Sequence, residues 1–223
     1  MQSENKAKIT RVLIGRVFDW GQYKNLRLSF ELNVEGLSEP DTNRAILEAF
    51  EKLAVINDVL FRSTRLYETL LFLDVDYTST IRSAITTANR HFNKHYKEWE
   101  CLNHFAEHKE IKEDCEDVIG AKTLTIAKQR AKELEEIIEK INKTRRFLLT
   151  AEEKKDEFKK KLEELIDELK TNFANGNFQE AQETIRKAQD VIDEVNKVYE
   201  AVKYYLRGWE PYMLDKDLEI LLG

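Results

Sequence analysis

All four histidines and both cysteines of this chain of 223 residues lie in one stretch, residues 91–115, HFNKHYKEWECLNHFAEHKEIKEDC. If the stretch is one helix, at about 100° per residue, four of these side chains fall within an arc of roughly 60°. They are Cys101, His104, His108 and Cys115. Zinc is bound by imidazole and thiolate groups, and two histidines at i and i+4 can share one ion. The candidate metal ligands are therefore His104, His108 and Cys101.

A single straight helix cannot complete such a site, because residues seven apart lie about 10 Å apart along its axis. A metal site would need a chain reversal near residues 100–103, or ligands from another element. On one helix Cys101 and Cys115 also lie about 21 Å apart, too far for a disulfide, so we expect two free thiols. Helical histidines beside Lys and Glu are usually solvated. We favour an ordinary helix and no cofactor, with a zinc site as the alternative.

Two short motifs resemble enzyme sites. His104, Glu107 and His108 read HFAEH, which resembles the H-x-x-E-H pattern of inverzincin peptidases and implies two zinc ligands and a glutamate that activates water. No further acidic ligand stands out downstream. The alternative is a chance match on a helix rich in glutamate.

The second motif is LLFLDVDYTST, residues 70–80, in which Asp74, Asp76 and Thr78 follow an apolar run. It resembles the opening motif of haloacid-dehalogenase-like phosphatases, which implies a nucleophilic first Asp, an acid/base second Asp and a bridging Mg²⁺. That fold needs further parallel strands, whereas the chain after residue 78 has helical periodicity. The alternative is that these side chains cap the next helix. We therefore expect no enzymatic activity.

A β-hairpin is predicted near the N-terminus. Residues 8–18 are rich in β-branched side chains, residues 25–35 alternate apolar and polar ones, and Gly21 can take the positive φ of a tight turn. Because an isolated hairpin is marginal in water, helices or a third strand must cover it. Residues 70–75 are a candidate for that third strand, or for a buried helical segment.

The hairpin concentrates positive charge in a chain of net charge −6. Residues 1–30 carry six basic and two acidic side chains, a local charge of +4. Aromatic rings beside cations suit single-stranded nucleic acid, because bases stack on the rings and phosphates pair with the cations. The candidate nucleic-acid-binding residues are Arg11, Arg16, Trp20, Tyr23, Lys24 and Arg27. The alternative is that the rings pack beneath the turn and the cations are solvated.

Two helices should follow the hairpin. Asp41 or Thr42 can cap the first, which we expect to end near residue 66, and the second should begin after Thr78 or Ser79.

Heptad periodicity dominates the chain from about residue 122 onwards. One register is broken only by Arg145 and Lys155, a second follows TNFANGN, and Gly176 in that segment predicts a helix stop and restart. Two long helices should therefore form an antiparallel hairpin. A capping-box pattern at Thr150 leaves open a break there, but the unbroken register favours one continuous helix.

These patterns predict an α+β fold that is mostly α, in two regions. Residues 1–119 should form an α+β region with the β-hairpin and two helices. Residues 120–223 should form an antiparallel coiled-coil hairpin with a short C-terminal tail.

Residues 9–36 also resemble the N-terminal β module of small uncharacterised proteins found in phages and mobile elements. The shared features are an apolar strand, a G-x-Y turn at Gly21 and Tyr23, and an alternating strand. The resemblance implies a viral or mobile-element setting and assigns no active residue.

Composition places the chain among folded globular proteins, with 42% apolar and 35% charged residues. The polar first residues and the short apolar runs predict neither a signal peptide nor a membrane span, so we expect a cytoplasmic protein. We predict a non-enzymatic binding or assembly protein that contacts single-stranded nucleic acid through the hairpin. The alternative is a purely protein–protein interaction subunit, with a partner or a second copy held by the helical hairpin.

Overall fold

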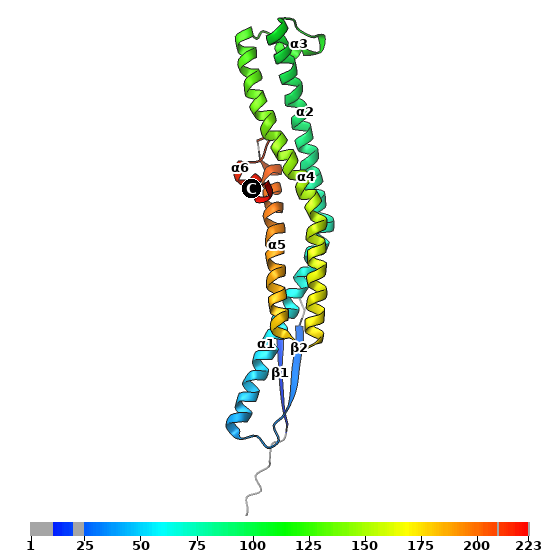
Figure 1. The fold of residues 1–223 in the computed structure, drawn as a ribbon, viewed down its shortest axis with the longest axis vertical. Helices are drawn as coiled ribbons and strands as arrows, with labels where there is room; N and C mark the ends of the chain where they lie inside the picture. The colour runs from blue at the N-terminus through cyan, green and yellow to red at the C-terminus, as the bar shows by residue number, and fades with distance from the viewer. Residues whose placement is uncertain (1–10, 20–24, 209, 223) are drawn as a thin grey trace, which may run out of the picture. The chain divides into compact units, whose positions relative to one another are not determined.

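The computed structural model describes residues 11–19, 25–208 and 210–222 (Figure 1). Its elements are the strands β1 (Arg11–Asp19) and β2 (Asn25–Asn33), the helix α1 (Glu39–Phe72), the π-helical turn η1 (Leu73–Tyr77), the helix α2 (Thr78–His108), the 3₁₀ turn η2 (Glu113–Cys115), and the helices α3 (Glu116–Ile119), α4 (Leu124–Ala174), α5 (Phe178–Arg207) and α6 (Asp215–Leu222). The chain is mostly helical and begins with a β-hairpin, as the sequence predicts.

The chain folds into two compact units, each built from segments that are distant in sequence. Unit 1 comprises residues 1–69 and 162–190, and unit 2 comprises residues 70–161 and 191–223. The boundary predicted from the sequence lies between residues 119 and 120. The two units do not follow that boundary, because α1, α4 and α5 each contribute residues to both units.

In unit 1 the two strands pair antiparallel, with Gly15 opposite Ser29. Ile14 of β1 is buried against Ala49 and Leu53 of α1, so a helix covers one face of the hairpin. Within the described residues the sheet has these two strands. The third strand suggested for residues 70–75 is wrong, since those residues are helical, and the helical alternative is correct.

The helix α1 begins one turn earlier and continues further than the sequence analysis predicts. Ser38 provides the cap, because its Oγ lies 3.3 Å from the backbone N of Asp41. An end near residue 66 is wrong, since α1 runs to Phe72 and joins α2 through η1. No Gly or Pro occurs between residues 41 and 119, so nothing in the backbone chemistry interrupts the helix.

The predicted antiparallel pairing of α4 and α5 is confirmed. Gly176 has a φ of 73°, and the N–H of Asn177 donates to the carbonyl of Asn172, which ends α4 before α5 begins. In unit 1 the fully buried Thr184 of α5 places its hydroxyl 2.8 Å from the carboxylate of Glu168 on α4. The helix α4 passes Thr150 without a break, as the register favours.

In unit 2, α4 also runs antiparallel to α2, and a series of hydrogen bonds shows the direction. As residue numbers fall along α2 and η1 they rise along α4: Glu98 with Arg130 (3.1 Å), Asn89 with Arg145 (2.9 Å), Tyr77 with the carbonyl of Ala151 (3.0 Å) and Asp74 with Lys159 (2.8 Å). Arg145, a break in the heptad register, also stacks over the ring of Phe92 at 4.4 Å. The register breaks there because the cation packs on α2.

The start of α4 packs on α2 rather than completing a two-helix coiled coil. Leu134, Ala127 and Ala131 are buried in one cluster with Leu102 of α2 and Ile119 of α3. The apolar positions of α4 therefore pack on two neighbours, α2 along the first half of α4 and α5 further along.

The C-terminal tail of unit 2 is anchored on α4. Met213 is buried, and its backbone N–H donates to the hydroxyl of the fully buried Thr144 over 2.8 Å. The ammonium of Lys140 lies 4.9 Å from the ring centre of Tyr212.

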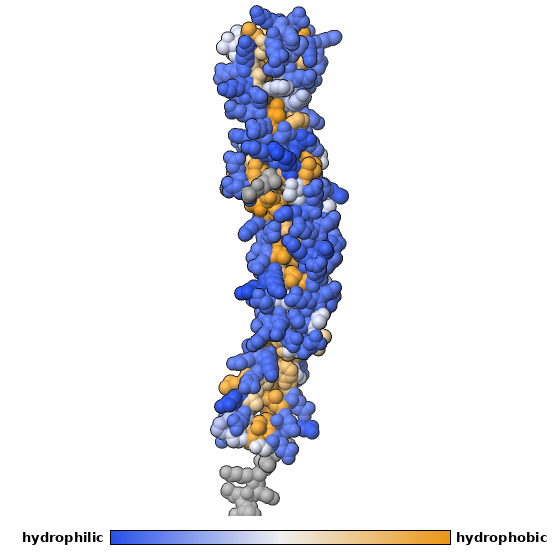
Figure 2. Space-filling view, in the orientation of Figure 1, coloured by the Kyte–Doolittle hydropathy of each residue, from blue (hydrophilic) through white to orange (hydrophobic). Residues whose placement is uncertain are grey.

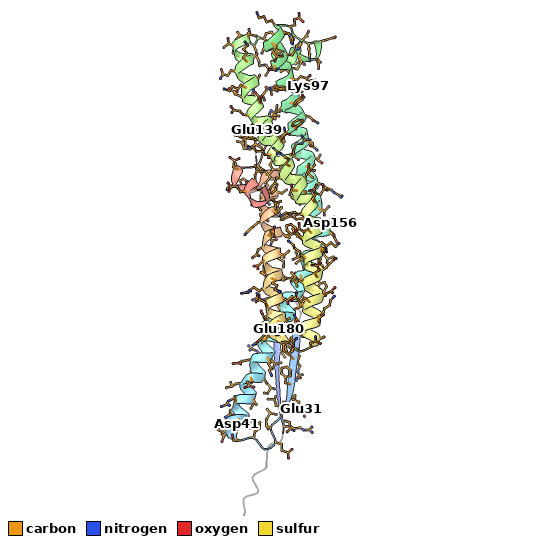
Figure 3. All side chains as sticks on the ribbon, in the orientation of Figure 1. Glu31, Asp41, Lys97, Glu139, Asp156 and Glu180 are labelled. Carbon is orange, nitrogen blue, oxygen red and sulfur yellow. A yellow bond between two sulfur atoms is a disulfide. The ribbon has the colours of Figure 1, made fainter. Side chains whose placement is uncertain are left out.

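Charged side chains occupy the exterior of both units. Lys97, Glu139 and Asp156 are exposed on the helices of unit 2, and Asp41 and Glu180 on those of unit 1 (Figure 3). Figure 2 shows apolar surface among these polar residues, including the region of the hairpin and the first turns of α1.

Candidate functional site

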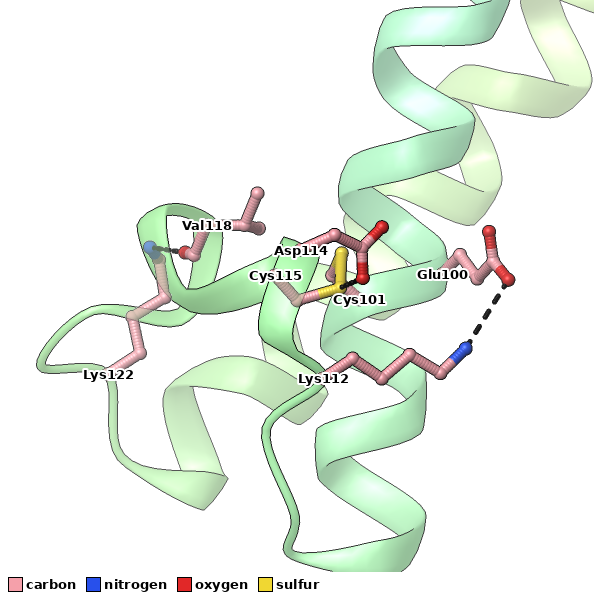
Figure 4. The surroundings of a disulfide bond; sticks show 7 residues. All are labelled: Glu100, Cys101, Lys112, Asp114, Cys115, Val118 and Lys122. Carbon is pink, nitrogen blue, oxygen red and sulfur yellow. Dashed lines mark hydrogen bonds and ion pairs between the residues drawn. A yellow bond between two sulfur atoms is a disulfide. The ribbon is translucent and has the colours of Figure 1, made fainter.

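The cysteines are joined in a disulfide, so the expectation of two free thiols is wrong. The Sγ atoms of Cys101 and Cys115 are 2.02 Å apart and the Cα atoms 5.4 Å apart (Figure 4). The reason is a chain reversal after residue 108. The helix α2 ends at His108, Lys109 takes the left-handed conformation with a φ of 60°, and η2 then brings Cys115 back to α2. The 21 Å separation assumed one straight helix, which the chain does not form.

The disulfide is part of a small apolar core at this end of unit 2. Both cysteines are 3% exposed and pack with Leu102, Ile119 and Leu134. Around it, the ammonium of Lys112 lies 3.6 Å from the carboxylate of Glu100. Figure 4 draws this ion pair as a dashed line. The same figure shows the Lys122 ammonium donating to the carbonyl of Val118. The disulfide therefore has a structural role, in which it joins residues 109–123 to α2.

The candidate metal ligands are brought only partly together. The rings of His104 and His108 have centroids 4.6 Å apart, but Cys101 is bonded to Cys115 and offers no thiolate in this state. Glu107 accepts a hydrogen bond from the Asn103 amide at 3.0 Å and lies 3.8 Å from the Nε2 of His108. Within the described residues, no group of three or more His, Cys, Asp or Glu side chains is arranged to hold a metal ion.

The other two histidines, His91 and His95, form a separate stacked pair on α2 with ring centroids 6.5 Å apart. Burial lowers the pKa of both imidazoles below the ordinary value. Their setting is that of partly buried helix residues.

The phosphatase-like motif lies inside a continuous helix rather than at the end of a strand. Asp74 and Asp76 belong to η1, and Thr78 donates to the carbonyl of Leu73 over 2.7 Å. The ammonium of Lys159 hydrogen-bonds the Asp74 carboxylate at 2.8 Å, which lowers the pKa of that carboxyl. Tyr77 is fully buried. The motif therefore lacks the strand that the phosphatase resemblance implies.

The candidate nucleic-acid residues divide between the two faces of the hairpin. Because side chains alternate along a strand, Arg11 and Arg27 lie on the outer face, opposite α1, while Arg16 lies on the face of Ile14. Arg11 is 3.2 Å from the Glu31 carboxylate, which offsets part of its charge. Trp20, Tyr23 and Lys24 lie outside the described residues.

Exposed apolar side chains of unit 1 form a further candidate surface that was not predicted from the sequence. Leu13 and Val17 are 71% and 61% exposed on the outer face of β1, and Leu47 and Phe50 are exposed one helical turn apart on α1. The sequence of β1 did contain a sign of this exposed apolar surface. Its apolar residues occupy both faces of the strand, whereas apolar and polar residues alternate strictly in β2. An apolar groove of about 250 Å³ also lies in unit 1, between α1 and α4.

Comparisons with protein-family models, curated proteins and solved structures find no match for this chain. No helix among the described residues is long and apolar enough to cross a lipid bilayer.

Proposed function

We propose that this chain is a non-enzymatic binding and assembly protein, and that the hairpin with the first turns of α1 binds a protein partner. The observation that carries the proposal is the outer face of β1, where Leu13 and Val17 are 71% and 61% exposed. Apolar groups gathered on a surface often mark interaction sites. Among residues 11–19 and 25–208 the sheet has two strands, so an outer strand edge adds a means of recognising an extended segment of a partner.

A second exposed apolar surface lies on α1, which packs against the other face of the hairpin. Leu47 and Phe50 are exposed three residues apart, the spacing that places two side chains on one helix face. A few well-packed residues, aromatic ones prominent among them, supply most of the binding energy in protein interfaces.

We expect a photo-cross-linking residue at Val17 to capture a discrete protein in extracts of the source cells. Val75 provides a matched control, since it is the same residue type, is 63% exposed and belongs to unit 2. Adding Leu13→Glu should weaken the capture at Val17 by roughly tenfold, because a charge replaces an apolar anchor. Equal products from Val17 and Val75, or capture that Leu13→Glu leaves unchanged, would contradict the proposal.

The second candidate function is binding of single-stranded nucleic acid, favoured by the common position of Arg11 and Arg27 on the outer face. Two cations on one face can contact successive phosphates, and Trp20 and Tyr23, which lie between the two strands in the sequence, would supply rings for stacking.

For this second function, binding of labelled oligonucleotides measured by fluorescence anisotropy should be modest and should weaken as salt rises. Arg27→Glu should weaken the binding and flatten its salt dependence, because fewer counterions are released. Trp20→Ala should weaken it by roughly tenfold. Arg146→Glu, an exposed residue of unit 2, makes the same charge change away from the hairpin. If it weakens binding as much as Arg27→Glu does, or if low salt gives no binding, the hairpin is not a nucleic-acid site.

The proposal includes a cytoplasmic location and a viral or mobile-element origin, the latter resting on the resemblance of residues 9–36. The disulfide favours a hyperthermophilic host. Disulfides are rare in the cytosol of mesophiles but common in intracellular proteins of hyperthermophiles. A content of 35% charged residues fits such a host.

A further inference from the structure

One edge of the strand β2 has no partner strand among the residues that the structure describes. Within the described residues β2 pairs with β1 alone. The helix α1 buries Ile14 of β1 to 4% exposure, but Leu28, Phe30 and Leu32 on the same face of β2 stay half-buried. A row of partly exposed apolar side chains therefore lies beside an unpaired edge, and a neighbouring strand would cover it.

The residue order of β2 is complementary to itself when the strand is reversed. The strand reads NLRLSFELN, with Ser29 at its centre. If a second copy runs antiparallel with the two Ser29 residues opposite each other, Arg27 lies opposite Glu31 of the second copy and Leu28 opposite its Phe30. The remaining pairs match in type, Leu26 with Leu32 and Asn25 with Asn33.

We propose that this chain forms a twofold-symmetric homodimer in which β2 pairs with β2 of a second copy about Ser29. The two hairpins would then make one four-stranded sheet. Two strands alone are marginal in water, whereas three or more with a covered apolar face are stable. The proposal is independent of whether the outer face of the hairpin also binds another protein.

Pairing β1 antiparallel with β1 of a second copy gives less complementary residue pairs. We therefore place the contact at the edge of β2. Centred on Gly15, the strand RVLIGRVFD would put Arg16 opposite Ile14 on the apolar face. Centred on Ser29, β2 puts apolar residues only opposite apolar ones and charges only opposite unlike charges. Opposite charges across paired strands set the register and reject a slipped alignment.

The arrangement also has room for both copies of α1. In a sheet of order β1, β2, β2, β1 the outer strands are three spacings apart, about 14 Å. Each α1 packs on Ile14 of its own β1. Helices about 10 Å in diameter can lie side by side at that separation. Leu28 and Phe30 of both copies would fill the space between them.

Exchanging the charges at Arg27 and Glu31 tests the antiparallel pairing of the two β2 strands about Ser29. Sedimentation equilibrium of the full chain should show a dimer. Arg27→Glu alone, or Glu31→Arg alone, places like charges opposite each other twice and should weaken dimerisation by about tenfold to thirtyfold. The double variant restores both pairs and should dimerise as the parent does. A mixture of the two single variants should form a heterodimer, because each then supplies the charge that the other needs.

Arg146→Glu serves as the control of equal charge change, and circular dichroism of every variant checks that the helices are intact. A parent that stays monomeric at high concentration would overturn the proposal. So would a dimer that the single variants leave unchanged, or a mixture of single variants that does not associate. Capture of a partner at Val17 is a separate readout, so this dimer and the proposed function can fail independently.

Discussion

Replacing both Cys101 and Cys115 by alanine should lower the free energy of unfolding by about 3 kcal/mol, as expected for a cross-link that closes a loop of this length. The two cysteines are 14 residues apart. The cross-link restricts the unfolded chain more than the folded one, so its loss favours unfolding. Alanine is chosen because both positions lie in an apolar cluster where a serine hydroxyl would be buried.

Denaturant unfolding followed by circular dichroism, with and without a reductant, measures the effect. The parent should lose stability when reduced, whereas the alanine double variant should not respond to the reductant. Hydrogen exchange should locate the change in residues 109–123, the segment that the disulfide joins to α2. A parent whose unfolding is unaffected by the reductant would show that the bond contributes no stability.

Leu134→Asp should destabilise unit 2 by about 4 kcal/mol or more, because it removes a large apolar side chain and places a carboxylate in the core. Leu134 is fully buried, in the cluster that contains Leu102 of α2 and the disulfide. The expected result is loss of the cooperative thermal transition, followed by circular dichroism.

Lys132→Asp is the matched control, since it introduces the same carboxylate two residues away at an exposed position of α4. It should change the melting temperature by a few degrees at most, because surface substitutions rarely exceed about 0.5 kcal/mol. Similar melting of the two variants would mean that Leu134 is not part of a packed core and that the contact between α4 and α2 is wrong.

Local patterns predicted the elements of this chain where their cause is local. The strict alternation in β2 places Leu28, Phe30 and Leu32 on the face that meets α1. Gly176 adopts the positive φ that ends α4. The burial of Ala181, Ile185 and Ala188 follows the heptad register of α5. In each case the residue spacing or the missing Cβ acts within one element, so no distant partner is needed to infer the result.

The candidate site was harder to predict, because its residues depend on neighbours that are distant in sequence. Asp74 follows an apolar run, as a strand-end residue would, but the run is helical and Lys159 on α4 binds the carboxylate. A short apolar run has the same pattern as a buried strand or a buried helix. Burial of Leu73 and Tyr77 accompanies the helical outcome.

Residue composition and spacing were enough to predict that this chain is mostly helical, that a β-hairpin rich in basic residues precedes the helices, and that the chain reverses at Gly176 between α4 and α5. The packing of the start of α4 on α2 and the bond between Cys101 and Cys115 depend on contacts between distant segments, so local patterns did not predict them. The reversal that permits this bond occurs at Lys109, with a φ of 60°. Lysine carries no preference for that left-handed conformation, which normally favours glycine, so packing rather than residue type sets the turn.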